Sequence, residues 1–279
     1  MELAGATAVI TGGASGIGLA SAQRFLELGA NVVLGDIEAG PLADAVERLG
    51  ERCVGLAVDV AREDDVVALR ELAIDTFGGV EVVFNNAGVG GGPTIGTPKA
   101  VWDWVMGVNV DGVVNGLNAF VPHFLERGRG WVVNTASLAG LGGVPGMGAY
   151  CASKFAVVGL SEALFHELAL AKRAVGVSVL CPGFVSTRIF ESQRNMPEDL
   201  RAYNERDNVR AVNAVAEKVV KAGIEPAQVA HAVAEAITRE QFWILTHEKV
   251  ALATTQLRLD WMRGGPPPGI NLERATRAQ

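Results

Sequence analysis

The sequence predicts an α/β fold in which helices cover both faces of one doubly wound parallel sheet of about seven strands. Short apolar runs rich in β-branched residues alternate with longer segments of helical pattern through most of the 279 residues. These apolar runs are nearly continuous, which is typical of strands that are buried on both faces. Hydrophobic residues make up 49% of the chain, so a large core can form.

The alternation assigns the elements in order. Strands are expected at residues 7–10, 31–34, 53–58, 80–84, 130–134, 175–180 and 242–245. Helices are expected at residues 16–28, 41–49, 63–77, 102–127, 149–171 and 226–239. Because strands and helices alternate in this way, we predict right-handed crossovers within a single domain over residues 1–259.

Two segments depart from the alternation. Residues 186–225 begin as a polar, irregular stretch and then become helical, so we interpret them as an insertion before the last helix and strand. Long insertions of this kind often serve as lids or binding loops. The tail at residues 260–279 is rich in glycine and proline and is expected to lack regular structure, either loose or packed on a neighbouring subunit.

The composition argues against several classes of protein. The formal net charge is −7, whereas a nucleic-acid-binding protein is expected to carry a basic face. No uninterrupted apolar stretch reaches the length of about 18 residues that suggests a membrane span, and the amino terminus lacks the positive region of a signal peptide. We therefore expect a cytoplasmic protein with neither a nucleic-acid nor a membrane partner.

The cysteines and histidines indicate a reduced protein without a metal site. The cysteines are odd in number, far apart and form no CxxC pair, unlike a secreted disulfide framework. Cys151 is interpreted as a small packed residue and not as a nucleophile, because no histidine is near it in sequence. The histidines have no metal-ligand spacing. These residues are Cys53, Cys151, Cys181, His123, His166, His231 and His247.

A glycine cluster between the first predicted strand and the first predicted helix indicates a phosphate-binding turn. Glycines there permit a tight turn and a close approach of the backbone to a pyrophosphate, and the helix offers free amides and a positive dipole end. Such a cluster is a weak signal alone, since many loops are rich in glycine. The cofactor-binding residues predicted in this turn are Gly12, Ser15, Gly16, Ile17 and Gly18.

Asp36, at the end of the second predicted strand, makes the prediction more specific. An acidic side chain at this place accepts hydrogen bonds from the ribose hydroxyls of an adenosine and repels a 2′-phosphate. Ile37 follows it, and neither Ala14 nor Ser15 is basic. NAD is therefore favoured over NADP as the cofactor. The alternative is that Asp36 only caps the helix that follows.

Tyr150 and Lys154 are four residues apart in a predicted helix and therefore share one face. A free phenol has a pKa of about 10, and a neighbouring ammonium lowers that pKa, so the tyrosine becomes a usable general acid or base. Ser137 follows the fifth predicted strand, at the same edge as the glycine turn, and its hydroxyl is expected to bind the oxygen whose bond order changes. This set predicts hydride transfer, whereas the pair alone also fits a solvated helix face.

These motifs together resemble the short-chain dehydrogenase/reductase family, over about residues 5–247 and in the order that the family has them. Beside the motifs above, Pro182 and Gly183 follow the sixth predicted strand, and Asn109 stands in a Val-Asn-Val run. The segments that match are TGGASGIG at residues 11–18, Asp59-Val60, NNAG at residues 85–88, Ser137 and the YxxxK pair. The resemblance implies a Rossmann-type fold and an oxidoreductase that transfers a hydride between NAD(P) and a secondary alcohol or ketone.

The resemblance also implies roles for individual residues. Tyr150 is the expected general base in alcohol oxidation and acid in carbonyl reduction, with Lys154 lowering its pKa and binding the nicotinamide ribose. Ser137 is expected to orient the substrate oxygen, and Asn109 to hold a water that links Lys154 to solvent. The other implied cofactor contacts are Asp59, Val60, Asn86, Ala87, Gly88, Pro182, Gly183, Val185 and Thr187. A homotetramer or homodimer built through the helices at 102–127 and 149–171 is implied as well.

The side chains expected around the substrate are mainly apolar, which favours a hydrophobic alcohol or ketone. Arg188 and Arg194 are expected either to meet an acidic substrate or to face solvent. An NADPH-dependent 3-oxoacyl-thioester reductase is an alternative that Asp36 disfavours. A non-catalytic dinucleotide-sensing protein is another, although sensing needs no proton donor. The expected apolar lining residues are Leu138, Leu141, Val144, Met147, Phe184, Ile189, Phe190 and Met196.

Overall fold

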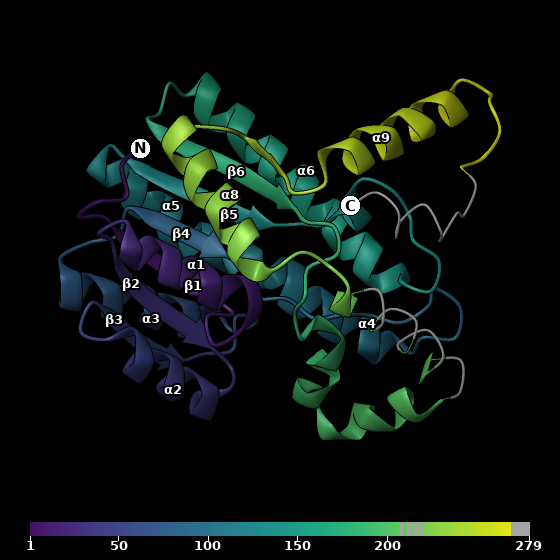
Figure 1. Ribbon diagram of the computed structural model, residues 1–279, viewed down its shortest axis with the longest axis horizontal. Coiled ribbons are helices and arrows are strands. Elements are labelled where there is room, and N and C mark those ends of the chain that lie inside the picture. Colours follow the sequence, from purple (N-terminus) through teal and green to yellow (C-terminus); the bar gives the residue numbers. More distant parts are fainter. Residues whose placement is uncertain (207–208, 211–213, 215–216, 218–219, 269–279) are drawn as a thin grey trace.

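The computed structural model describes residues 1–206, 209–210, 214, 217 and 220–268 (Figure 1). Its strands are β1 (Thr7–Thr11), β2 (Asn31–Asp36), β3 (Cys53–Ala57), β4 (Val82–Asn85), β5 (Gly130–Thr135), β6 (Val175–Cys181) and β7 (Trp243–Leu245). They form one parallel sheet in the order β3-β2-β1-β4-β5-β6-β7. Because the chain leaves β1 first toward β3 and later toward β7, the sheet is doubly wound and the predicted fold class is confirmed.

Helices cover both faces of this sheet (Figure 1). The α-helices are α1 (Gly16–Glu27), α2 (Ala39–Leu49), α3 (Glu63–Phe77), α4 (Lys99–Met106), α5 (Gly112–Arg127), α6 (Gly148–Leu170), α8 (Pro226–Arg239) and α9 (Glu248–Met262). The strands begin and end within two residues of the predicted bounds. Strong periodicity therefore located the strands well, whereas helix α9 was not predicted.

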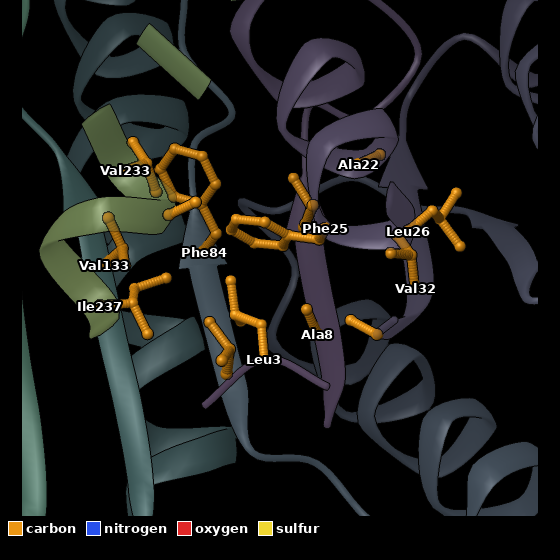
Figure 2. Close-up of a cluster of buried hydrophobic side chains, with 14 of the residues drawn as sticks. Leu3, Ala8, Ala22, Phe25, Leu26, Val32, Phe84, Val133, Val233 and Ile237 are labelled. Carbon is orange, nitrogen blue, oxygen red and sulfur yellow. The ribbon is translucent and has the colours of Figure 1, made fainter. Parts of the chain in front are cut away.

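The core lies in two layers, one on each side of the sheet. Successive strand residues point to opposite faces, so neighbours in β1 belong to different clusters. Ala8 packs in the cluster that α1 and α8 cover, whereas Val9 packs in the cluster under α3 and α5. Figure 2 shows the first cluster, in which Phe25 of α1 lies beside Phe84 of β4, with Ile237 of α8 nearby. Burial on both faces explains why the strands read as continuous apolar runs.

The helix predicted at residues 102–127 is interrupted by a π-helical segment. This segment, η1 (Gly107–Asp111), joins α4 to α5. A π-turn is a wide local turn that often occurs at functional sites, and here it contains the buried Asn109. The periodicity of the sequence does not reveal it, because one wide turn leaves the apolar pattern on both sides intact.

The insertion and the tail differ in part from the predictions. The insertion begins with two short 3-10 helices, η3 (Ile189–Asn195) and η4 (Glu198–Glu205). Met196 and Tyr203 from this region pack against Val101 of α4. The prediction of an irregular tail from residue 260 is wrong at its start, because α9 continues to Met262. Residues 265–268 have no regular structure, and residues 269–279 lie outside the described part of the chain.

Within the described ranges, no helix has the length and apolarity needed to cross a membrane. In the same ranges, no group of three or more His, Cys, Asp or Glu side chains is placed to hold a metal ion. Cys53, Cys151 and Cys181 are all free and buried.

Candidate active site

A cavity of about 670 Å³ lies at the carboxyl ends of the parallel strands. Open α/β sheets bind ligands at this edge, where the strand order reverses. The structure brings almost all predicted site residues together here. Those that line the cavity are Gly12, Ser15, Gly16, Ile17, Asp36, Asp59, Val60, Asn86, Ala87, Gly88, Ser137, Tyr150, Lys154, Pro182, Gly183, Val185 and Thr187. Gly18 and Asn109 are the predicted residues that do not line it.

The glycine turn between β1 and α1 needs its glycines for two different reasons. Gly12 and Gly16 have φ angles of +65° and +54°, in the left-handed region that side chains disfavour. A Cβ on Gly18 would be 2.2 Å from the carbonyl oxygen of Gly12, so Gly18 supports the turn from behind. Ser15 is extended and makes no side-chain cap, which leaves the first amides of α1 free to bind an anion.

Asp36 is buried at the carboxyl end of β2, and its carboxylate is oriented by the backbone around it. One oxygen accepts a hydrogen bond from the amide of Ala14 at 2.9 Å, and the other accepts one from the amide of Glu38 at 3.0 Å. A carboxylate has about four acceptor positions, so it can still receive the hydroxyls of a ribose. The glycine turn and Asp36 are therefore one connected unit.

The NNAG segment is tied to β1 by a threonine that the sequence analysis did not select. The hydroxyl of Thr11 accepts hydrogen bonds from the amides of Asn86 and Ala87, at 3.0 and 3.1 Å. The side-chain amide of Asn86 in turn donates to the carbonyl oxygen of Thr11 at 3.0 Å. A Cβ on Gly88 would be 3.5 Å from the Lys154 Nζ, so the small residue keeps space for that ammonium.

Ser137, Tyr150 and Lys154 meet at the far side of the cavity from Asp36. Ser137 caps η2 (Leu138–Gly140), where its Oγ accepts a hydrogen bond from the amide of Ala139 at 3.1 Å. Its hydroxyl is also hydrogen-bonded to the phenol of Tyr150. Lys154 is one turn after Tyr150 in α6, with its Nζ 5.6 Å from the centre of the phenol ring. The Nζ donates to the carbonyl oxygen of Thr135 at 2.8 Å.

Burial dominates the electrostatics of this group. Burial raises the pKa of the Tyr150 phenol, and the hydrogen bond with Ser137 opposes this rise. Burial also lowers the pKa of Lys154 to about 8. The net shift of the Tyr150 pKa is therefore upward, and Lys154 is not among the groups that cause it, so the expected lowering by Lys154 stays a prediction. The phenol of Tyr150 is therefore protonated at neutral pH.

Asn109 links the segment after β4 to helix α6. Its Oδ1 accepts a hydrogen bond from the amide of Val89 at 2.8 Å. Its Nδ2 donates to the carbonyl oxygen of Val89 at 3.0 Å and to the Oγ of Ser153 at 2.9 Å. The side chain therefore fixes the end of the NNAG segment against α6. The predicted role in holding a water stays a prediction.

Asp59 and Val60 form the wall beyond β3. The Asp59 carboxylate accepts a hydrogen bond from the amide of Ala61 at 3.0 Å. The carbonyl oxygen of Val60 accepts one from Asn115 of α5 at 2.9 Å. These bonds leave the Asp59 side chain in the cavity wall, at the same end as Asp36.

The segment after β6 forms the opposite wall. The amide of Gly183 donates to the Oγ1 of Thr246 at 3.2 Å, and Val185 pairs with Ile224 in an isolated bridge. Thr187 lies against the glycine turn, 3.2 Å from the position that a Cβ on Gly16 would take. The two walls therefore approach each other over the amino terminus of α1.

Comparison with known proteins identifies the family of this chain. The family model for short chain dehydrogenases matches residues 6–198. The chain belongs to this family. It is 41% identical, over 202 residues, to 3beta-hydroxysteroid dehydrogenase 2 from Eggerthella lenta, an alignment that covers 70% of this chain and 77% of that one.

A second relative of this short-chain dehydrogenase is 2-(R)-hydroxypropyl-CoM dehydrogenase from Xanthobacter autotrophicus, with 36% identity over 199 residues and coverage of 68% and 79%. Among solved structures, it resembles a short chain dehydrogenase/reductase from Burkholderia phymatum in complex with NAD. The TM-score is 0.92 at 40% identity, with 97% of this chain and 99% of that chain covered. The chain is thus an oxidoreductase that uses a nicotinamide dinucleotide.

The cavity itself fits such a dinucleotide. The free amides of α1 suit a pyrophosphate, and the carboxylate of Asp36 suits a ribose. The turn requires glycine at Gly12 and Gly18, because a Cβ on either residue would collide with backbone atoms. The Ser137, Tyr150 and Lys154 group stands at the other end, where the nicotinamide is expected.

The apolar lining is mostly as predicted. Leu138, Val144, Met147, Phe184, Ile189 and Phe190 line the cavity, together with Trp104 and Val108, which the sequence analysis missed. Leu141 instead packs in a cluster with Val157 and Cys181. Met196 instead packs with Val101 and Tyr203. Trp104 lies just before the π-helical segment and Val108 lies within it. Neither residue follows a strand, so the reasoning from strand ends did not identify them.

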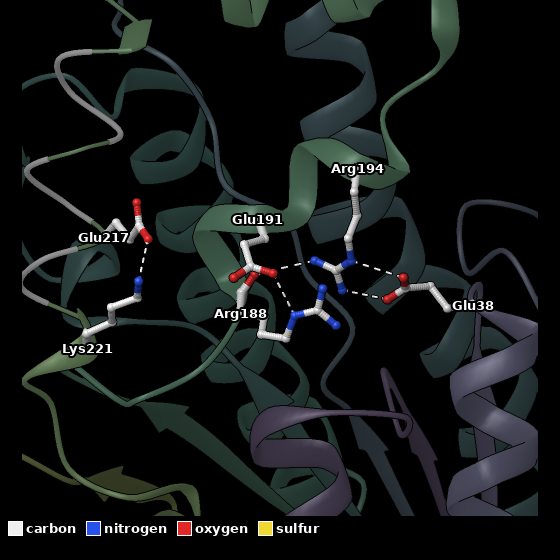
Figure 3. Close-up of polar contacts among 6 residues, drawn as sticks. All are labelled: Glu38, Arg188, Glu191, Arg194, Glu217 and Lys221. Carbon is white, nitrogen blue, oxygen red and sulfur yellow. Dashed lines mark hydrogen bonds and ion pairs between the residues drawn. The ribbon is translucent and has the colours of Figure 1, made fainter.

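Arg194 is the clearest difference from the sequence analysis. Instead of facing solvent or a substrate, its guanidinium makes two hydrogen bonds with the carboxylate of Glu38, at 3.0 and 2.5 Å (Figure 3). The two residues are 156 positions apart and both line the cavity. No local pattern in the sequence predicts an ion pair between Glu38 and Arg194, because they are so far apart in the chain. Arg188 is half-exposed and pairs with Glu191.

Proposed function

We propose that this short-chain dehydrogenase transfers a hydride between NAD(H) and a hydrophobic secondary alcohol or ketone. The observation that carries the proposal is that Ser137, Tyr150 and Lys154 open into the same cavity as Asp36 and the glycine turn. A dinucleotide bound from Asp36 along the glycine turn would extend toward the hydroxyls of Ser137 and Tyr150, which line the same cavity. Binding alone requires no proton donor there, so the arrangement favours an enzyme over a dinucleotide sensor.

In this proposal side chains of the protein transfer the proton, and a bound nicotinamide would accept or donate the hydride. The hydroxyls of Ser137 and Tyr150 hold the substrate oxygen between them. Tyr150 takes the proton of that oxygen during oxidation and returns it during reduction. Lys154 binds the nicotinamide ribose and stabilises the phenolate as it forms, from its position one turn along α6. Asn109 keeps the NNAG segment in place beside them.

The rest of the cavity supports an apolar substrate. Six of the eight predicted apolar residues line it, and Trp104 adds an aromatic surface. The relative named as a 3beta-hydroxysteroid dehydrogenase supports a bulky alcohol of this kind. We propose that the other predicted cofactor-binding residues that line the cavity contact the dinucleotide, whereas Gly18 acts through the shape of the turn.

NAD is the proposed cofactor in preference to NADP. In support, Asp36 lies at the carboxyl end of β2, where an acidic side chain disfavours a 2′-phosphate, and the similar protein from Burkholderia phymatum is in complex with NAD. The same carboxylate disfavours the alternative of an NADPH-dependent 3-oxoacyl-thioester reductase.

We also propose a homotetramer or homodimer in the cytoplasm. Phe165 and Leu170 of α6 are 42% and 84% exposed, which suits a helix that packs on a second copy. The three free cysteines suit a reducing compartment.

The proposal is tested by following nicotinamide absorbance with a panel of secondary alcohols, including steroids, sugars and aliphatics, with NAD⁺ and with NADP⁺. We expect turnover with NAD⁺ on an apolar class. Tyr150→Phe is expected to lower turnover at least about 100-fold while NADH still binds. Tyr203→Phe is the matched control, because the Tyr203 hydroxyl is bonded to Thr97 and not to Ser137. Wild-type turnover in Tyr150→Phe contradicts the proposal.

A further inference from the structure

The ion pair between Glu38 and Arg194 lies over the end of the cavity that holds Asp36. Glu38 is the residue before α2, two positions after Asp36, and its amide donates to the Asp36 carboxylate. Arg194 reaches it from η3 in the insertion (Figure 3). Both side chains are about three-quarters buried or more, with exposed fractions of 27% for Arg194 and 21% for Glu38. The pair is therefore part of the cavity wall and not a surface contact.

Arg194 is close enough to Asp36 to be influenced by its charge. The hydrogen bond and charge of Glu38 raise the pKa of Arg194 most, and the charges of Glu191 and Asp36 raise it further. Among the described residues that line the cavity, the basic ones are Lys154, Arg188 and Arg194. Lys154 is beside Tyr150, and Arg188 is paired with Glu191. Arg188 also lies near Glu38, since its charge helps to lower the Glu38 pKa, but Arg194 is the cation that hydrogen-bonds to Glu38 at the Asp36 end of the cavity.

A guanidinium at this place is chemically suited to a phosphate. Its planar fork binds phosphate and carboxylate groups through two parallel hydrogen bonds, and Glu38 now occupies that fork. A 2′-phosphate on the adenosine ribose would have to compete with Glu38 for Arg194, while two carboxylates, Asp36 and Glu38, repel it. The guanidinium of Arg194 is therefore a group suited to phosphate whose hydrogen-bond donors are occupied by Glu38.

We propose that Glu38 helps to determine cofactor specificity by holding Arg194 in this ion pair and so denying it to the 2′-phosphate of NADP(H). This inference rests on the proposed binding of NAD(H) and assigns specificity to a residue pair outside the glycine turn. Without the Glu38 charge, Arg194 is free to bind a 2′-phosphate beside Asp36. Asp36 still repels that phosphate, so removal of Glu38 is expected to weaken the NAD preference without reversing it.

The test measures binding rather than turnover. Titration calorimetry compares 5′-AMP with adenosine 2′,5′-bisphosphate, and nicotinamide fluorescence compares NADH with NADPH. In Glu38→Gln, affinity for adenosine 2′,5′-bisphosphate relative to 5′-AMP is expected to rise about tenfold, equal to about 1.4 kcal/mol. In Glu38→Gln combined with Arg194→Met, the gain is expected to disappear. The gain is also expected to shrink at high salt, which screens the phosphate from the guanidinium.

Controls keep the result specific. Glu217→Gln removes one negative charge from the Glu217–Lys221 pair, which lies apart from Glu38 and Arg194 in Figure 3, and is expected to leave the ratio unchanged. Glu38 makes no side-chain cap to α2, so its replacement is not expected to unfold the protein. Glu38→Ala provides a second variant in which no amide can bond to Arg194.

The possible results distinguish a failure of this inference from a failure of the proposed function. An unchanged ratio in both Glu38 variants, while NADH still binds, overturns this inference and leaves the proposed function intact. A gain that survives the loss of Arg194 also overturns it. If the wild-type protein binds neither NADH nor 5′-AMP, the proposed function and this inference both fail.

Discussion

At the scale of single residues, the main result concerns the proton chemistry of Tyr150 and Lys154. Their spacing predicted a shared helix face, and the structure places the ammonium 5.6 Å from the phenol ring. Proximity alone does not decide the pKa of the phenol, however. Burial raises the pKa of Tyr150 and lowers that of Lys154 to about 8, because both charged forms lose water.

The pH dependence of the reaction follows from the protonation of Tyr150. Alcohol oxidation needs the phenolate, so kcat/KM for oxidation is expected to rise with pH from about 7 to 10. Carbonyl reduction needs the neutral phenol, so its kcat/KM is expected to fall at alkaline pH. Initial rates in both directions across this range test the prediction. Parallel pH profiles for the two directions contradict a proton role for Tyr150.

Lys154 gives a prediction on stability. Its pKa is about 8 in the folded protein, below the value of about 10.4 in an unfolded chain. Between these values the unfolded chain binds a proton that the folded protein lacks, so stability rises with pH across this window, by about 3 kcal/mol in total. Below pH 8 the cost of the buried charge is fully present. Urea unfolding of the wild type and Lys154→Met at pH 7 to 9.5 is the measurement, and an equal slope in both contradicts the assignment.

At the scale of elements, the junctions after the strands position the site. The β1–α1 turn depends on Gly18 behind it, and Thr11 ties the end of β1 to the NNAG segment after β4. The π-helical segment between α4 and α5 holds Asn109 against Val89 and Ser153. Each junction places backbone groups, which is why small or amide side chains occupy these positions.

Gly18→Ala tests the β1–α1 turn. Its Cβ would be 2.2 Å from the Gly12 carbonyl oxygen, a backbone atom that cannot move without distorting the turn. We expect the free energy of unfolding to fall by about 1–3 kcal/mol and NADH to bind at least about tenfold more weakly. Gly40→Ala in α2 is the control, since its Cβ would meet no atom within 4 Å. Chemical unfolding and NADH fluorescence are the measurements, and wild-type affinity in Gly18→Ala contradicts the role of the turn.

At the scale of the whole molecule, the cavity combines residues from Gly12 to Val220. Its two ends are supplied by different halves of the sheet, with Asp36 from β2 and Ser137 from the segment after β5. The Glu38–Arg194 pair closes the wall between the first half and the insertion. A ligand that spans both ends therefore contacts groups that only the complete fold brings together.

Cofactor binding is expected to stabilise the whole fold, since an unfolded chain has no such cavity. NADH at about 100 times its Kd is expected to add about 2.7 kcal/mol to the free energy of unfolding. This corresponds to a rise in Tm on the order of 5 °C. Thermal unfolding at matched concentrations of NADH and NADPH tests this, with the smaller rise expected for NADPH. An equal rise for both contradicts the NAD preference.

Much of the fold and of the site could be predicted from the sequence. Buried strands read as continuous apolar runs, and the residues that bind ligands in parallel sheets follow those strands directly, as Asp36, Asn86 and Ser137 do. Helix α9 was missed because its apolar residues, such as Leu252, Leu257 and Trp261, are spread around the helix and remain exposed. Periodicity signals a helix only where one face is buried.

The sequence by itself determined the order of the elements, the glycine turn, Asp36 and the Ser137, Tyr150 and Lys154 set. These features depend on local spacing, because residues four apart share a helix face and strand ends share an edge of the sheet. Only the tertiary structure decided the direction of the Tyr150 pKa, since burial depends on every element around it. It also decided the pairing of Glu38 with Arg194, because contacts between residues 156 positions apart arise from the path of the whole chain.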